Sequence, residues 1–158
     1  MQLRFVRAKH GRYRLEVTRR DGTTTAREMA ENLIAHDLAH LAWERHTGAR
    51  ESFFGQLEAG AGLEEVAILP YDERGSNEAR VTEAIVGMLQ TGVPRGASEG
   101  LLVERARALL ACQSLPLPPT LTVENLRAVA DAFRRLAGQF AALKVGEALE
   151  VELVLGER

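Results

Sequence analysis

The sequence predicts an α+β fold in which a small, mostly antiparallel sheet packs with about four to five helices. Three observations predict it: residues 2–19 alternate between apolar and polar side chains, residues 149–155 do the same, and the segment between them has helical periodicity. The C-terminal strand has no sequential partner, so we expect it to return to the N-terminal strands and bring the chain ends together. With 158 residues, the chain is expected to form a single domain, residues 1–158.

The N-terminal segment is predicted to form a three-stranded meander. Its turns fall at residues 10–11 and 21–22, the second being an Asp-Gly pair that tolerates positive φ. Residues 23–25 supply a short third strand. In the C-terminal strand, Glu150 and Glu152 are expected opposite an arginine row as cross-strand ion pairs. The apolar face carries Leu3, Phe5, Tyr13, Leu15 and Val17, and the arginine row on the other face is Arg4, Arg12 and Arg14.

Four or five helices are predicted between the two sheet segments. The first ends at Gly48, a residue favoured just after a helix, and a later one begins with a Ser98 cap. A connector with three prolines, residues 114–120, separates the last two helices. The last helix has apolar residues at alternating three- and four-residue steps, which predicts a helical hairpin with the helix before it. The expected ranges are about 33–47, 52–57, 77–92, 98–113 and 122–143.

The composition argues against several classes of partner. Lys and Arg number 20 against 22 Asp and Glu, so the chain has no basic excess of the kind that nucleic-acid binding usually requires. The chain contains no long apolar run and no signal peptide. Its single cysteine, Cys112, has no partner for an intramolecular disulfide. We therefore expect a cytoplasmic protein without nucleic-acid or membrane partners.

A polar stripe on the first helix gives the strongest chemical signal. His36 and His40 are four residues apart and share a face, and Asp37, Glu44 and Thr47 fall within the same arc of about 100°. Convergent imidazoles and carboxylates suit a divalent metal such as zinc, if one more ligand comes from elsewhere and one position stays open for water. The sequence therefore predicts His36 and His40 as metal ligands, with Glu44 as a further ligand or as a carboxylate that supports one.

Asp37 is the candidate catalytic residue. It takes the place of the glutamate that acts as general base in H-E-x-x-H zinc proteins, and the reaction would then be hydrolytic. Aspartate is one methylene shorter, so it reaches a metal-bound water less easily. His46 would extend the pattern to three histidines, but Trp43 stands where those proteins need glycine, so we expect His46 to point away. Asp72 and Glu73 are a further candidate source of a ligand carboxylate.

Two functions of different classes are compatible with this stripe. A metal site predicts nitrogens of His36 and His40 within roughly 4 Å of each other, a third ligand, a hydrogen-bond acceptor behind a histidine and an open pocket. The alternative is a non-enzymatic interaction or regulatory module that acts through the helical hairpin, for example by joining copies of the chain into a homo-oligomer. It predicts an exposed apolar patch on the hairpin, and histidines that are solvated or bonded to backbone.

Three short stretches are similar to those of a protein family. They are His36-Asp37-Leu38-Ala39-His40 with Glu44, then Phe53-Phe54-Gly55, and an aromatic-x-x-L-x-x-G-x-x-L segment from Phe140 to Leu149. On these stretches the chain resembles a family of uncharacterised bacterial proteins that open with a strand-rich segment. It departs from them at Ala35, where relatives often have proline, and at Phe140, where they have tryptophan. The resemblance implies an architecture and candidate residues, and it implies no activity.

Overall fold

The computed structural model describes residues 1–68 and 75–155. It confirms the predicted α+β class. The helices that were not predicted are two short ones, η1 and α3. In chain order the elements are β1 (Gln2–Arg7), β2 (Arg12–Thr18), β3 (Thr24–Ala30), η1 (Glu31–Leu33), α1 (Ile34–Thr47), α2 (Phe53–Glu58), α3 (Leu63–Val66), α4 (Asn77–Gly92), α5 (Glu99–Cys112), α6 (Val123–Ala141) and β4 (Ala148–Glu152).

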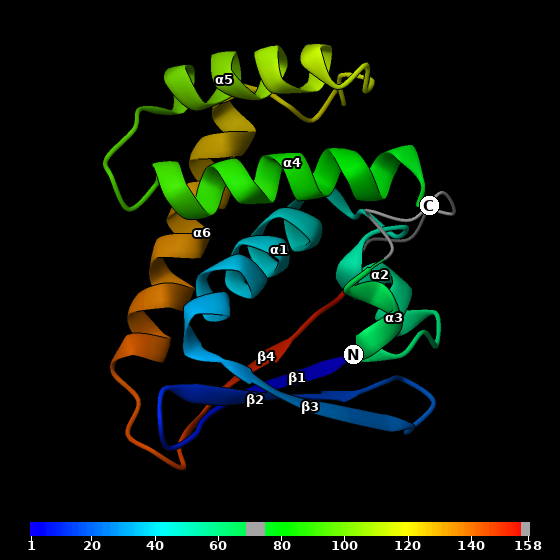
Figure 1. Cartoon of the computed structure of the whole chain (residues 1–158), viewed down its shortest axis with the longest axis vertical. Coiled ribbons are helices and arrows are strands. Elements are labelled where there is room, and N and C mark those ends of the chain that lie inside the picture. Colours follow the sequence, from blue (N-terminus) through cyan, green and yellow to red (C-terminus); the bar gives the residue numbers. More distant parts are fainter. Residues whose placement is uncertain (69–74, 156–158) are drawn as a thin grey trace.

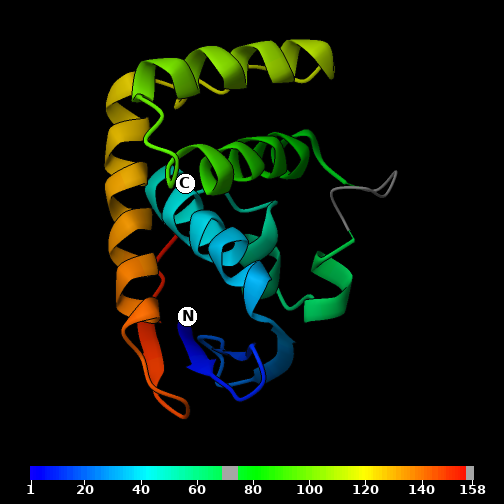
Figure 2. The same ribbon diagram turned by 60° about the vertical axis from the view of Figure 1, so that its left-hand side comes forward.

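The four strands form one antiparallel sheet in the order β3-β2-β1-β4, on which the helices lie (Figure 1). β4 pairs with β1, so the two ends of the chain meet in the sheet as predicted (Figure 2). The amino group of Met1 donates a hydrogen bond of 3.0 Å to the carbonyl of Leu153 and fixes this edge. The predicted apolar face is confirmed as the inner face: Leu3, Phe5, Tyr13, Leu15 and Val17 are all fully buried.

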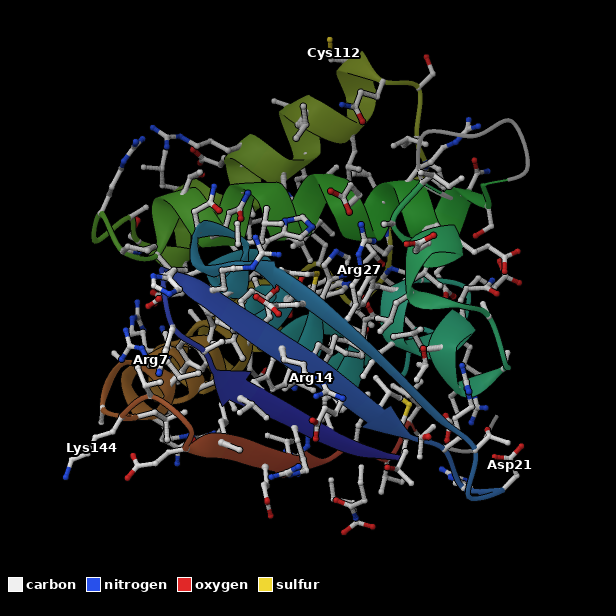
Figure 3. All side chains as sticks on the ribbon, turned by 60° about the horizontal axis from the view of Figure 1, so that its bottom comes forward. Arg7, Arg14, Asp21, Arg27, Cys112 and Lys144 are labelled. Carbon is white, nitrogen blue, oxygen red and sulfur yellow. The ribbon has the colours of Figure 1, made fainter. Side chains whose placement is uncertain are left out.

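The polar face of the sheet points away from the helices, and Figure 3 shows Arg14 on it. Arg4 forms the predicted ion pair with Glu150, at 3.0 Å. Arg12 and Arg14 instead pair with Glu28 and Glu16. The reason is the strand order: β1 separates β2 from β4, so Glu150 reaches only Arg4 of the predicted row, and Glu152 lies opposite Gln2.

The third strand is longer than predicted and spans Thr24–Ala30 instead of residues 23–25. It is an edge strand, and its sequence lacks the apolar alternation that would have revealed it. Its pairing with β2 is nevertheless complete, from Thr18 opposite Thr24 to Arg12 opposite Ala30. The inner face of its second half forms one wall of a cavity described below.

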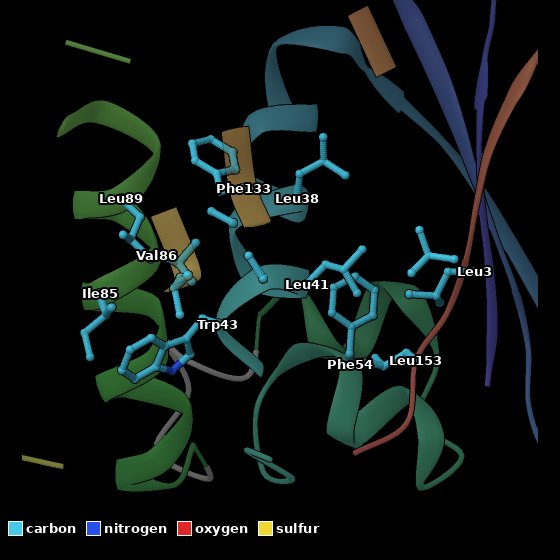
Figure 4. Packing of buried hydrophobic residues seen from close by; sticks show 14 of the residues in the cluster. Leu3, Leu38, Leu41, Trp43, Phe54, Ile85, Val86, Leu89, Phe133 and Leu153 are labelled. Carbon is cyan, nitrogen blue, oxygen red and sulfur yellow. The ribbon is translucent and has the colours of Figure 1, made fainter. Parts of the chain in front are cut away.

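Helix α1 lies at the centre of the fold. The sheet lies on one side of it and α4 on the other, and α6 and α2 also contact it. In Figure 4, Trp43 extends toward Ile85 and Val86 of α4, whereas Leu41 lies beside Phe54 and toward the sheet. Because α1 is covered from these directions, every residue from Asp37 to Glu44 is buried. The middle of the polar stripe, with Asp37, His40 and Glu44, therefore lies inside the protein, whereas His36 and Thr47 are half-buried.

The predicted hairpin partners are consecutive and in contact, but they do not lie along each other. Helix α5 crosses the first turns of α6 (Figure 2). The apolar stripe of α6 packs mainly against α1, and Leu126, Val129, Phe133 and Phe140 of this stripe are buried. Within the described parts of the chain, no helix combines the length and the apolar character needed to cross a bilayer.

Candidate metal centre

Two side chains of α1 and one of α4 converge on a single point. Nε2 of His36 lies 3.2 Å from Nε2 of His40. The Glu83 carboxylate lies 3.1 Å from Nε2 of His40 and 3.4 Å from Nε2 of His36. One ligand atom from each residue lies within 4.8 Å of the other two. This group could hold a metal ion, and the predicted closeness of the two histidine nitrogens is confirmed.

The spacing of these atoms suits a small tetrahedral ion. Two ligand atoms that each lie about 2.0–2.1 Å from a tetrahedral zinc are separated by about 3.4 Å. The 3.2 Å between the two histidine nitrogens is close to one edge of such a tetrahedron, whereas Glu83 contacts His36 through Oε1 and His40 through Oε2. His40 is almost fully buried, whereas the side chains of His36 and Glu83 keep 25% and 19% of their exposure. The group is thus enclosed on the His40 side and accessible on the His36 side.

Glu44 supports His40 from behind. Its Oε1 lies 2.9 Å from Nδ1 of His40, and its side chain is completely buried. Oε2 of Glu83 lies 3.1 Å from the other ring nitrogen, Nε2, so each nitrogen of His40 faces a carboxylate that can accept a hydrogen bond from it. Of the two roles predicted for Glu44, the structure favours the supporting one.

The other oxygen of Glu44 joins the site to the start of α2. Oε2 accepts hydrogen bonds from the backbone N–H of Phe54, at 2.8 Å, and of Gly55, at 3.1 Å. Ser52, the residue before this helix, makes no capping hydrogen bond, so Glu44 takes that role from another helix. A Cβ on Gly55 would lie 2.2 Å from the Arg50 carbonyl oxygen, so only glycine fits this close approach.

Two of the three stretches that suggested the family resemblance, residues 36–44 and 53–55, contact each other at Glu44. Phe53 places its ring against His40, with 5.4 Å between ring centroids, and Phe54 is fully buried in the core. The third stretch reaches the site through Tyr13, whose ring meets Phe140 edge-on at 6.1 Å. The three stretches therefore form one connected unit around α1.

Two opposing effects set the ionisation of the central pair. Burial favours the neutral form of His40, but hydrogen bonds to Glu44 and Glu83 outweigh it and raise the pKa of His40 to about 9. Burial opposes the charge of Glu83, yet hydrogen bonds from His36 and His40 hold the pKa of Glu83 well below its usual range. Glu83 is therefore anionic at neutral pH, and His40 holds a proton.

Asp37 lies beside the group and is held by the sheet. Its Oδ2 accepts a hydrogen bond of 2.6 Å from the hydroxyl of Tyr13. Burial raises the pKa of Asp37, although this hydrogen bond opposes the shift. Burial and the Asp37 charge raise the pKa of Tyr13, so its hydroxyl stays protonated and donates. Asp37 lines a cavity together with His36, His40 and Glu83.

The remaining sequence candidates lie elsewhere. His46 contacts Asn125 of α6 at 3.0 Å, because α1 continues past Trp43 without a turn. Asp72 and Glu73 fall outside the described residues. Glu83 was not predicted as a ligand, since one glutamate in an amphipathic helix is an ordinary surface residue. Only the packing of α4 on α1 places it beside the histidines.

The cavity at this group has a volume of about 390 Å³ and is partly open to solvent. It lies between α1, the edge strand β3, and the helices α2, α3 and α4. A volume of this size is at the small end of the range for ligand pockets, about 300–1,000 Å³. The acceptor behind His40 and the open pocket, both expected of a metal site, are thus present.

Comparison with protein-family models, with curated proteins and with solved structures gave no match for this chain.

The buried Glu44 carboxylate gives a stability prediction. We expect Glu44→Ala to lower the free energy of unfolding by about 3 kcal/mol, because it leaves a buried imidazole and two backbone N–H groups without their acceptor. Urea denaturation followed by circular dichroism measures the change. Glu104→Ala, at an exposed position of α5, is the matched control and should change stability by less than about 0.5 kcal/mol. Equal stability of the two variants would contradict the support assigned to Glu44.

Proposed function

We propose that this protein binds one divalent metal ion, zinc by preference, through Nε2 of His36, Nε2 of His40 and the carboxylate of Glu83. The observation that supports this most is the convergence of three ligand atoms within 4.8 Å at the wall of a cavity. Glu44, which orients His40 from behind, is the partner that metal-binding histidines ordinarily have.

The donor set also favours a reactive ion over a structural one. Two imidazoles and one carboxylate leave a tetrahedral ion with a fourth position, which is the arrangement of catalytic zinc sites. Structural zinc sites are closed by four protein ligands, with cysteine prominent among them. Cys112 is the only cysteine of the chain and lies exposed at the end of α5, remote from α1 in sequence. The fourth position would face the cavity and admit water or a ligand.

A hydrolytic reaction follows from this arrangement. A divalent ion here would supply Lewis acidity and a more acidic bound water. Asp37 lines the same cavity, and its raised pKa makes it a better proton acceptor than an ordinary aspartate. The hydroxyl of Tyr13 fixes the position of the Asp37 carboxylate. We therefore assign Asp37 as the general base and Tyr13 as the residue that positions it.

The alternative, an interaction module acting through the hairpin, is supported less well. It requires histidines that are solvated or bonded to backbone, whereas His40 is buried and contacts three side chains. Leu101 and Leu109 of α5 are exposed at 39% and 36%, so self-association through this helix stays a prediction.

The metal content of protein purified without an affinity tag or chelator tests the proposal. We expect close to one zinc per chain in the wild type after incubation with zinc and removal of the excess. His36→Ala and Glu83→Gln should each lose most of it, because each removes one of three ligands. Elemental analysis after gel filtration provides the measurement.

His46→Ala is the matched control, since it removes a histidine of the same helix that contacts Asn125 instead of the group. It should retain the wild-type zinc content. A wild type without bound zinc, iron or manganese would overturn the proposal, as would equal metal loss in all three variants.

Metal binding should release a proton from His40. The raised pKa of about 9 means that His40 is protonated at pH 7.5, and a metal ligand has to be neutral. We expect about one proton released per zinc at pH 7.5, and apparent affinity that increases with pH up to about 9, above which His40 has no proton to lose. Calorimetric titrations in two buffers of different ionisation enthalpy measure the release. Binding with no proton release would contradict this account of His40.

The assignment of Asp37 makes a separate prediction. Asp37→Asn should keep the zinc content and lower ester hydrolysis by a factor of about 10²–10⁴, the usual contribution of a general base. Hydrolysis of p-nitrophenyl acetate by the zinc-loaded protein supplies the rate, and Asp131→Asn on the exposed face of α6 is the control. A rate unchanged by Asp37→Asn would remove Asp37 from the reaction while leaving the metal site intact.

A further inference from the structure

Arg27 is an exposed residue of the edge strand β3, and it lies at an inward-facing register position of the sheet. Arg27 lies opposite Leu15 in the pairing of β3 with β2, and Leu15 is fully buried on the inner face. The alternation of β3 therefore places Arg27 and Met29 on the side that faces the helices. In Figure 3, Arg27 lies on the helix side of β3, whereas Arg14 lies on the outer face of the sheet. Because β3 is an edge strand, Arg27 lines the cavity without entering the core.

Among the described residues that line this cavity, the charged side chains other than Arg27 have partners. Glu28 pairs with Arg12, Asp37 accepts the Tyr13 hydroxyl, and Glu83 is held by the two histidines. Over residues 1–68 and 75–155, the Arg27 guanidinium has no ion pair or hydrogen bond. A guanidinium is always charged and presents donors in a planar fork that fits a carboxylate. Within the described part of the chain, the cavity therefore offers one positive charge whose donors are available to a ligand.

The rest of the cavity wall is apolar. Met29, Phe53, Leu63 and Val66 line it, and the ring of Phe53 lies against His40, beside the proposed metal position. With a volume of about 390 Å³ the cavity has room for a small molecule and not for a polymer chain. A ligand that fills it has an apolar body and one anionic end.

We propose that the cavity takes a small monocarboxylic acid with an aromatic or branched apolar body, whose carboxylate pairs with Arg27. This inference deepens the proposed function and rests on it for the reacting end of the ligand. With the carboxylate on Arg27 and the body against Phe53 and Val66, an ester or amide bond at the far end would face His36, His40 and Glu83. Hydrolysis there adds water across that bond and gives an acid and an alcohol or amine.

Binding of two probes of equal size tests the assignment of Arg27. The probes are 3-phenylpropanoate and its neutral counterpart 3-phenylpropanamide, titrated calorimetrically into zinc-loaded and zinc-free protein. We expect the wild type to bind the acid at least tenfold more tightly than the amide in both forms. Arg27→Gln should abolish this preference and leave amide binding and zinc content unchanged. Arg14→Gln, on the outer face of the same sheet, is the matched control and should retain the preference.

A charge reversal keeps the test independent of small losses in folding. Arg27→Glu should bind 3-phenylpropan-1-amine more tightly than the acid, which inverts the preference of the wild type. If the wild type does not distinguish acid from amide, or if Arg27→Gln still prefers the acid, the inference is overturned. A preference seen only with zinc and unchanged by Arg27→Gln would mean that the carboxylate binds the metal. Protein that takes no zinc but keeps an Arg27-dependent preference would overturn the proposed metal function alone.

Discussion

The Glu44 carboxylate is completely buried and accepts hydrogen bonds from His40 of its own helix and from two backbone N–H groups at the start of α2. A buried carboxylate is tolerated only when its lone pairs are occupied, so these three donors have to stay in place together. Gly55 has to be glycine because a Cβ there would clash with the backbone of Arg50. One side chain thus fixes the position of α2 against α1 and the orientation of the His40 ring, whose Nε2 lies beside His36 and Glu83.

This constraint explains why a polar stripe occupies the most enclosed helix of the fold. Burying Asp37, His40 and Glu44 next to Leu38 and Leu41 would destabilise the protein if any of the three lacked a partner. Each has one: Asp37 binds Tyr13 of the sheet, His40 binds Glu83 of α4, and Glu44 binds α2. The helix is therefore attached by polar contacts to three neighbouring elements, in addition to its apolar packing.

The sequence predicted the layered fold because alternation and helical period are local signals. Leu3 and Phe5 revealed the inner face of the sheet, and Ser98 and Gly48 marked helix ends correctly. His36 and His40 were found because their spacing is also local. Glu83, which meets these histidines from α4, was not predicted, since no local pattern distinguishes it from a surface glutamate. The second half of β3, with Arg27 and Met29, was not predicted for a related reason. Strand residues that line a cavity need not be apolar, so the sequence of β3 lacks the alternation of apolar and polar residues.

In the proposed metal centre, the charges around His40 would favour a divalent ion over a proton. Glu44 and Glu83 approach the imidazole from opposite nitrogens, and together they raise the pKa of His40. A proton supplies one positive charge to two carboxylates, whereas a divalent ion bound to neutral histidines supplies two. Such an ion at Nε2 would keep the hydrogen bond that Nδ1–H donates to Glu44. It would replace only the hydrogen bond to Glu83. The contacts that hold the proton are therefore the ones that would orient the metal ligands.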